Sequence, residues 1–242
     1  MEKSNGWINV IYNSYSEISL DLGTYDNDAW INKQKYRVEN FDNERDLTIQ
    51  RNKLLIDTVN SIKKRKISIL DYGGGFGLSY LPLIESTKKK IKYHIIEIDG
   101  VSKAATDFYN KDQLISFSSN FEDEKLKDCD IAYIRTSLQY AADWKKVLKS
   151  IGNVKPEKIV MSDASIGNID TFLTIQSWGS QKIPYWFINE KELVDLVISL
   201  GYSLESRHIA RDITLEAAWK TQRKYPKEYR IDTLKNLVFQ RV

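Results

Sequence analysis

The chain shows a regular succession of short apolar runs and amphipathic segments. Apolar residues recur at helical spacing in several segments, which predicts helices near residues 43–64, 78–87, 101–109, 142–151 and 190–200. Runs rich in Ile, Val, Leu and Tyr predict strands at residues 66–72, 91–99, 114–118, 130–136, 158–163, 202–208 and 233–241. Because strands and helices alternate, we predict an α/β fold with a mostly parallel sheet that helices cover on both faces.

Two segments rich in aromatic residues show neither the period of a helix nor that of a strand. Residues 1–42 combine tryptophan and tyrosine with many polar residues, and residues 164–187 hold a second group of aromatic residues. The N-terminal segment is therefore either a strap over the edge of the core or a lid that forms one wall of a substrate pocket. We predict a single domain with its core at 43–242 and with insertions at 164–187 and 210–231.

Composition and charge limit the classes of function. A chain of 242 residues with 42% apolar and 29% charged residues is long and apolar enough for one globular α/β domain. The formal net charge is +3, and lysine and arginine are spread among acids, so nucleic acid is not an expected partner. The charged insertion at 210–231 is expected to form a solvated helix over the sheet edge or to meet a phosphorylated donor.

Cysteine usage and hydropathy indicate the compartment. Cys129 is the single cysteine, which excludes an internal disulfide and a CxxC zinc site, and we predict no metal. The first residues do not resemble a signal peptide, and no apolar run approaches the roughly 20 residues of a membrane-spanning helix. We therefore expect a cytoplasmic protein with no membrane span.

The strongest chemical signal is the glycine cluster after the predicted strand at 66–72. The run ends in Asp71 and continues into Gly73, Gly74, Gly75 and Gly77. Glycine is required where the backbone adopts positive φ or touches a ligand, and the following helix offers free N–H groups. In parallel sheets, ligands bind outside the carboxyl ends of the strands. We therefore predict a ligand site at this turn.

The spacing of the glycines favours one kind of ligand. Dinucleotide-binding turns follow G-x-G-x-x-G, whereas this turn reads G-x-G-x-G with Asp71 two residues before the first glycine. A carboxylate is awkward beside a diphosphate and suits a cationic amino group, which S-adenosylmethionine (SAM) carries. The strand at 91–99 ends in Glu97 and Asp99, one of which should accept hydrogen bonds from the ribose hydroxyls. Glu97 is the first choice, and Asp99 remains open.

These motifs resemble those of known enzymes. D-Y-G-G-G-F-G followed by an acidic strand end is similar to the first two motifs of class I SAM-dependent methyltransferases. Together with the N-terminal G-W and G-T-Y-D, then S-L-Q-Y-A-A-D-W, P-Y-W-F-x-x-x-x-E-L and L-G-Y, they resemble a family of bacterial methyltransferases encoded among lipopolysaccharide, O-antigen and capsule genes. The resemblance covers roughly residues 6–205.

The resemblance implies a Rossmann-like fold whose last strand is antiparallel, SAM as methyl donor, and O-methylation of a sugar or sugar-linked group. The acceptor is then a small molecule or a glycan precursor. The implied donor site consists of Asp71, Gly73, Gly74, Gly75 and Gly77 for the amino-acid part, Glu97 or Asp99 for the ribose, Asn120 and Phe121 for the adenine, and Ser137, Leu138 and Gln139 near the methyl group.

The general base and the acceptor atom remain open at this stage. Asp163, at the end of the strand at 158–163, and His208, near the end of the strand at 202–208, are candidate bases. Tyr140 is a candidate to orient the nucleophile. Alternatives are an N-methyltransferase of a small amine, a non-catalytic SAM-fold partner of another pathway enzyme and, least favoured, a nicotinamide-dependent oxidoreductase.

Overall fold

The computed structural model describes residues 6–20, 22–110, 112, 114–122, 126, 128–178, 181–214 and 216–242. Residues 1–5, on which the expectation of no signal peptide partly rests, lie outside the described residues. The central sheet has seven strands in the order β10-β11-β6-β5-β2-β3-β4. Their bounds are Lys66–Tyr72 (β2), Lys90–Ile96 (β3), Ile115–Ser118 (β4), Ile131–Arg135 (β5), Lys158–Ala164 (β6), Tyr202–Asp212 (β10) and Thr233–Arg241 (β11).

The topology confirms the predicted Rossmann-like sheet. Strands β2 to β6 pair in parallel, and β11 is antiparallel to both β6 and β10. From β2 the chain first moves outward through β3 and β4, and it then returns to place β5 and β6 on the other side of β2. The crossovers therefore diverge between β2 and β5, and the crevice for a ligand opens at the carboxyl end of β2.

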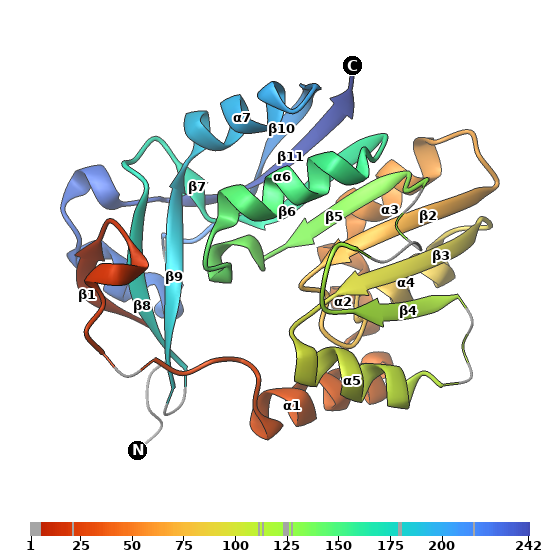
Figure 1. Cartoon of the computed structure of the whole chain (residues 1–242), viewed down its shortest axis with the longest axis horizontal. Coiled ribbons are helices and arrows are strands. Elements are labelled where there is room, and N and C mark those ends of the chain that lie inside the picture. Colours follow the sequence, from red (N-terminus) through yellow and green to blue (C-terminus); the bar gives the residue numbers. More distant parts are fainter. Residues whose placement is uncertain are drawn as a thin grey trace.

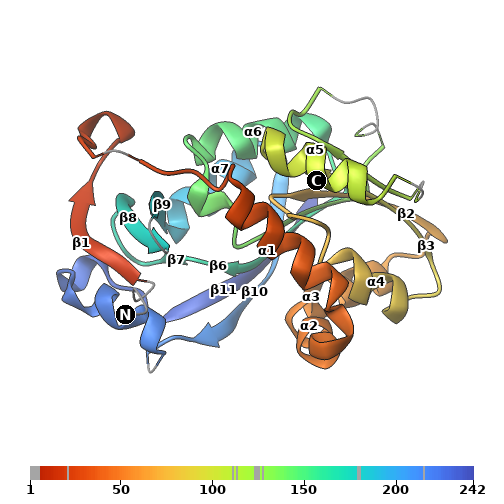
Figure 2. The same ribbon diagram turned by 90° about the horizontal axis from the view of Figure 1, so that it is seen from below.

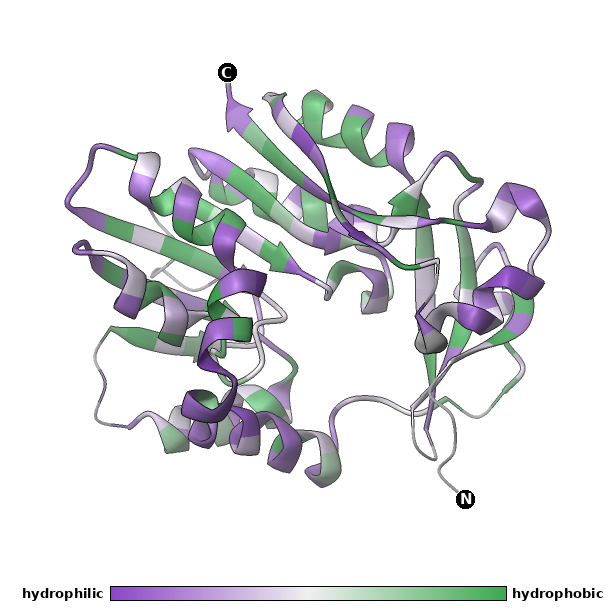
Figure 3. Cartoon of the chain, turned by 180° about the vertical axis from the view of Figure 1, so that it is seen from behind, coloured by the Kyte–Doolittle hydropathy of each residue, from purple (hydrophilic) through white to green (hydrophobic). Residues whose placement is uncertain are grey.

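Helices cover both faces of this sheet, as predicted (Figure 1). Alternate strand residues point to opposite faces, and the buried apolar residues of β2, β5, β6 and β11 belong to the clusters on both faces. Figure 3 shows green segments in the strands beneath the helices. One face packs against α3 (Lys53–Ser61) and α4 (Tyr80–Ser86), and the other packs against α6 (Trp144–Val154) and α7 (Glu190–Ser199).

A second, smaller sheet occupies the segment for which no regular structure was expected. Its order is β1-β8-β9-β7, with β1 at Gly6–Tyr12, β7 at Ile166–Gly167, β8 at Phe172–Trp178 and β9 at Gln181–Asn189. The sequence pattern of 164–187 therefore did not indicate these strands. The physical reason is that both faces of β9 are buried, with Tyr185 packed beside Trp7 and Trp186 in the main core, so apolar and polar residues do not alternate.

The N-terminal segment also contains regular structure that its sequence pattern did not indicate. Strand β1 pairs with β8, far along the chain, and a short 3-10 turn, η1 (Tyr15–Glu17), follows it. Helix α1 (Asp28–Glu39) then lies beside α5 (Asp99–Phe108), at the bottom of the view in Figure 1 and toward the reader in Figure 2. Gln34 and Val38 are the buried residues of α1, so the helix lacks the broad apolar stripe that reveals helices in a sequence.

Two further expectations require correction. The predicted helix at 43–64 is divided into η2 (Phe41–Glu44), α2 (Arg45–Arg51) and α3, with the buried Asn52 between the last two. The side chain of Asn52 donates to the Thr48 carbonyl at 2.8 Å and accepts from the Tyr133 hydroxyl at 3.2 Å, which stabilises the break.

The insertion at 210–231 is not a solvated helix. Beyond the end of β10 it forms the 3-10 segments η5 (Ala217–Lys224) and η6 (Lys227–Tyr229), and η5 packs against β1. Trp219 and Tyr225 are buried in the core of the smaller sheet. Among the described residues, no helix has the length and apolar character needed to cross a membrane.

Candidate donor and acceptor site

A cavity of about 600 Å³ opens at the carboxyl ends of β2, β3 and β5. This volume lies within the range of typical small-molecule sites. Its walls come from the glycine turn, from the ends of β3 and β5, from the N-terminal segment and from β9. The cavity therefore lies at the switch point of the sheet, where the sequence places the ligand.

The glycine turn after β2 forms the floor of the cavity. The N–H of Gly73 donates to the Ile96 carbonyl at 2.8 Å, which ties the turn to β3. Gly73 adopts φ of +72°, and a Cβ there would lie 2.3 Å from the Cβ of Ser137. A Cβ on Gly74 would lie 2.3 Å from a carboxylate oxygen of Asp71. The turn thus leaves bare backbone toward the cavity.

The four predicted glycines differ in their position relative to the cavity. Gly73, Gly74 and Gly75 line the cavity, whereas Gly77 lies beneath the turn, where its added Cβ would meet Ile115 at 2.7 Å. Gly77 therefore permits close packing of the turn on the sheet.

Asp71 is a buried carboxyl at the base of the cavity. It is 1% exposed, and it accepts a hydrogen bond from the Tyr93 hydroxyl at 2.7 Å. Burial raises the pKa of Asp71 to about 7, although the Tyr93 hydrogen bond and Arg135 act in the opposite direction. A cationic group placed beside Asp71 would favour its ionised form.

Of the two acids that follow β3, the structure brings Glu97 to the cavity. Its carboxylate accepts from the backbone N–H groups of Gly75 and Ile98, each at 2.9 Å. Burial raises the pKa of Glu97, and these two hydrogen bonds act against that shift. Asp99 is exposed and begins α5, away from the cavity lining.

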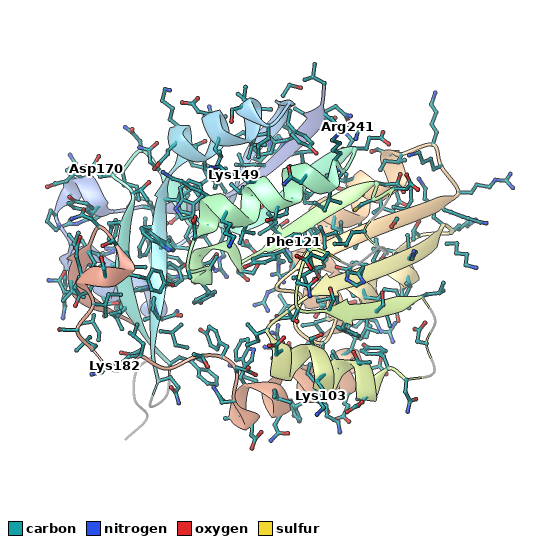
Figure 4. All side chains as sticks on the ribbon, viewed as in Figure 1. Lys103, Phe121, Lys149, Asp170, Lys182 and Arg241 are labelled. Atoms are coloured by element: carbon teal, nitrogen blue, oxygen red, sulfur yellow. The ribbon has the colours of Figure 1, made fainter. Side chains whose placement is uncertain are left out.

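The loop after β4 contributes to the same rim. Ser119 lines the cavity. The next two residues, Asn120 and Phe121, are not among the lining residues: the Asn120 side chain accepts from the Glu122 N–H at 2.9 Å, and Phe121 (labelled in Figure 4) stacks on Tyr72 with a ring separation of 6.0 Å.

The turn after β5 contributes the side opposite this loop. Arg135, Thr136 and Ser137 line the cavity, and the Ser137 hydroxyl donates to the Tyr72 carbonyl. Thr136 adopts φ of +48°, which is unusual for a β-branched residue and marks a tightly determined turn. Leu138 and Gln139 are buried behind the lining, in the 3-10 turn η4 (Leu138–Tyr140).

The two candidate bases lie outside the cavity lining. Asp163, at the end of β6, accepts from Nε and Nη2 of Arg135 at 3.2 and 3.1 Å, so the arginine stands between Asp163 and the cavity. His208 is exposed on β10, where it lies opposite Asn236 of β11. The structure therefore brings Asp163 near the site through Arg135 and leaves His208 away from it.

Tyr140 does line the cavity, within a group of aromatic residues. Its hydroxyl donates to the Gln176 side-chain oxygen at 2.8 Å, and the Tyr25 hydroxyl donates to the same oxygen at 3.2 Å. The Tyr25 ring lies edge-on to Tyr140 at 5.0 Å and 4.3 Å from Trp30. Burial raises the pKa of Tyr140 well above its usual value, so its hydroxyl is a hydrogen-bonding group rather than a base.

The polar lining residues that sequence reasoning missed include Gln34, Arg37 and Arg135. Arg135 left one signal, a charged residue at the carboxyl end of a buried strand. Gln34 and Arg37 left none, because α1 has little amphipathic pattern and meets the glycine turn only in the folded chain.

Comparison with known proteins identifies the fold. No protein-family model matches the chain, and no curated protein matches its sequence. Among solved structures it is similar to a Burkholderia thailandensis 1,6-didemethyltoxoflavin-N1-methyltransferase, solved with S-adenosylhomocysteine and 1,6-didemethyltoxoflavin bound, at 12% identity and a TM-score of 0.56 over 93% of both chains. The fold is that of the SAM-dependent methyltransferases.

Two other structures show how widely this fold is used. An S-adenosylmethionine-dependent methyltransferase from Clostridium acetobutylicum ATCC 824 matches at 10% identity and a TM-score of 0.53, over 86% of this chain and 98% of the other. The [4+2]-cyclase SpnF matches at 14% identity and a TM-score of 0.52, over 77% and 79%. The fold alone therefore leaves the reaction open, and the site has to decide it.

Proposed function

We propose that the chain is a SAM-dependent methyltransferase that O-methylates a sugar or sugar-linked group during synthesis of a surface polysaccharide. The observation that carries the donor part of this proposal is the pairing of Asp71 with a glycine turn whose backbone faces the cavity. The polysaccharide part rests on the sequence resemblance. We further propose that the reaction takes place in the cytoplasm and that the segment through residue 42 acts as a lid on a single catalytic domain.

The residues at the floor fit the methyl donor. SAM has an ammonium group and no phosphate, which suits a cradle that holds a carboxyl rather than a cluster of phosphate-binding cations. Asp71 would bind the ammonium, and the bare backbone of Gly73 and Gly74 leaves room for the amino-acid chain. Glu97 faces the cavity, where it would accept hydrogen bonds from both ribose hydroxyls.

The adenine would lie between the loop after β4 and the end of β3. Ser119 and Ile98 line this end of the cavity, and the neighbouring Asn120 and Phe121 border it. Ser137, with Leu138 and Gln139 behind it, would support the methyl-bearing end.

The donor supplies a methyl group that is already activated by its bond to a sulfonium. The residues of this chain therefore have to align the acceptor and exclude water. Tyr140, which Gln176 holds in place, would orient the acceptor hydroxyl. Asp163 would take the proton when Arg135 moves from it toward the acceptor. His208 stays outside this scheme because of its exposed position on β10.

The acceptor would lie against the aromatic wall. Tyr15, Tyr25, Trp30 and Tyr140 all line the cavity. Aromatic faces combined with a few polar groups suit the apolar face and the hydroxyls of a sugar ring.

One observation favours a second candidate, methylation of nitrogen in a small amine. No histidine is among the residues described as lining the cavity, and a neutral nitrogen with a lone pair needs no base before it attacks. A non-catalytic SAM-fold protein remains the third candidate.

Calorimetric titration with S-adenosylhomocysteine tests the donor part. We expect a dissociation constant well below millimolar for the unsubstituted protein and strong weakening in Asp71→Asn. An intact fold that binds neither SAM nor S-adenosylhomocysteine would refute the proposal. Incubation with nucleotide sugars, capsule fragments and small amines, followed by mass spectrometry, tests the acceptor: a gain of one methyl group on a sugar supports the first candidate, and a gain on an amine supports the second.

A further inference from the structure

The cavity contains a cationic side chain, Arg37, that has no role in the donor contacts proposed above. We propose that Arg37, carried by α1, binds the carboxylate of the amino-acid part of the methyl donor, so that the N-terminal segment forms part of the donor site. This inference rests on the proposed function, because it takes SAM as the ligand.

The charges that line the cavity single out Arg37. Arg37 and Arg135 are the cationic side chains among the described lining residues. Arg135 is engaged by Asp163 through two of its nitrogens. Arg37 is half-buried and forms no hydrogen bond or ion pair with any described residue, although Glu44 attracts it electrostatically. Its guanidinium is therefore available to an anion that enters the cavity.

Packing places Arg37 beside the glycine turn. The buried Gln34 lies so close to the turn that a Cβ on Gly75 would be 2.7 Å from its side-chain oxygen. Arg37 follows Gln34 by three residues, so both project from the same side of α1. Figure 2 shows α1 running in front of the central sheet, between α5 and the pair α2 and α3. The helix is thus held against the donor cradle at the point where Arg37 projects.

The free cavity holds two like charges close together. Burial, followed by the charge of Arg135, lowers the pKa of the Arg37 guanidinium. An anion that binds near both groups would relieve this repulsion, and it would exchange the water around Arg37 for charge-assisted hydrogen bonds. The site is therefore electrostatically prepared for a negative group.

The structure of the methyl donor indicates that the negative group bound by Arg37 is its carboxylate. Its ammonium and carboxylate sit on the same carbon atom, so the partner of the carboxylate has to lie near the partner of the ammonium. Arg135 is close enough to both Asp71 and Arg37 to shift the pKa of each. Asp71 and Arg37 thus provide the negative and positive halves of a receptor for a zwitterion. The planar fork of arginine suits a carboxylate better than an ammonium point charge does.

The test compares two ligands that differ only in this carboxylate. S-adenosylhomocysteine and its decarboxylated analogue are titrated by calorimetry into the full chain, into Arg37→Met and into Lys35→Met. Lys35 is the matched control, because it lies on α1, is exposed and pairs with Glu39 at 3.8 Å. We expect Arg37→Met to bind S-adenosylhomocysteine about 10- to 100-fold more weakly, since a hydrogen bond to a charged group is lost. Affinity for the decarboxylated analogue should change less than about threefold.

Two further measurements keep the outcome interpretable. Arg37→Lys should bind S-adenosylhomocysteine more tightly than Arg37→Met does. The control Lys35→Met should bind it as tightly as the unsubstituted chain does. Ligand-free Arg37→Met should unfold at the same temperature as the unsubstituted chain or above it, because the repulsion from Arg135 is gone.

Equal weakening of both ligands, or an unchanged affinity for S-adenosylhomocysteine, would overturn the inference. If affinity is unchanged but methyl transfer is lost, Arg37 serves the acceptor instead, and the inference is again wrong. Failure of the unsubstituted chain to bind S-adenosylhomocysteine would overturn the proposed function itself.

Discussion

The two walls of the cavity are built in different ways. The core wall comes from the ends of β2, β3 and β5, and it presents glycine backbone and the carboxyl groups of Asp71 and Glu97. The cap wall comes from the N-terminal segment, with lining residues between Tyr15 and Arg37, and from β9, and it presents aromatic rings and one arginine. From this difference we propose a division of labour in which the core wall holds the donor and the cap wall selects the acceptor, while Arg37 of the cap wall also binds the donor.

The largest expected effect concerns the backbone of the core wall. Gly73→Ala places a Cβ 2.3 Å from that of Ser137 in a residue with φ of +72°, so the turn has to move. We expect affinity for S-adenosylhomocysteine to fall by about 100-fold or more, which corresponds to about 2.7 kcal/mol.

Gly201→Ala is the matched control for this substitution. Gly201 also has positive φ, +91°, but an added Cβ there meets nothing within 4 Å. It should cost about 1–3 kcal/mol of unfolding free energy and leave ligand affinity unchanged. Comparable losses of affinity in both variants, measured by calorimetry, would show that the core wall is not the donor site.

The next effect separates the two acids after β3. Glu97→Gln should weaken S-adenosylhomocysteine about 10- to 100-fold, because charge-assisted hydrogen bonds to the ribose are lost. Asp99→Asn should change affinity by less than about twofold, because Asp99 is exposed outside the lining. If Asp99→Asn weakened binding more than Glu97→Gln in a calorimetric titration, Asp99 would be the residue that binds the ribose.

The pH dependence of binding tests the carboxyl of Asp71. Its pKa is raised to about 7, so roughly nine-tenths of it is protonated at pH 6, and an ammonium then loses its charged partner. We expect affinity for S-adenosylhomocysteine to fall about tenfold between pH 8 and pH 6. Asp71→Asn should bind weakly with a flat profile, and an unsubstituted chain with a flat profile would contradict this role.

The raised pKa of Asp71 also makes the stability of the ligand-free protein depend on pH, in the direction opposite to that of ligand binding. The folded chain holds the Asp71 proton more tightly than the unfolded chain does. The contribution of this carboxyl to the free energy of unfolding is therefore complete at pH 4 and below. That contribution is lost as the pH rises through about 7. Denaturant unfolding of the ligand-free protein at pH 5 and pH 8, compared with Asp71→Asn, measures it; a contribution that grows with pH would show that Asp71 is ionised in the free fold.

The smallest effect concerns the cap wall. Tyr25→Phe removes a neutral hydrogen bond to Gln176, whose oxygen still accepts from Tyr140. We expect unfolding free energy to fall by about 1 kcal/mol and affinity for S-adenosylhomocysteine to stay within about twofold. A large loss of donor affinity would show that the two walls do not divide the tasks.

Much of the central sheet could be predicted from the sequence, since both ends of each strand from β2 to β6 lie within about three residues of the predicted ends. Local sequence patterns carry this information: apolar runs, helix-capping residues and glycines at positive φ. Asn189 is one such capping residue, because its side chain accepts from the Glu192 N–H. The smaller sheet escaped prediction because β1 finds its partner β8 only after the chain has folded.

The sequence by itself determined the place of the proposed donor cradle, because Asp71, the glycine turn and Glu97 come from two consecutive strand ends of a parallel sheet. Parallel topology brings such strand ends to one rim whatever the details of packing. The tertiary structure alone decided that α1 places Gln34 and Arg37 at that cradle and that Arg135 engages Asp163. It also decided that His208 lies exposed on an edge strand, outside the cavity lining. These placements depend on contacts between residues far apart in the chain, and no local pattern encodes them.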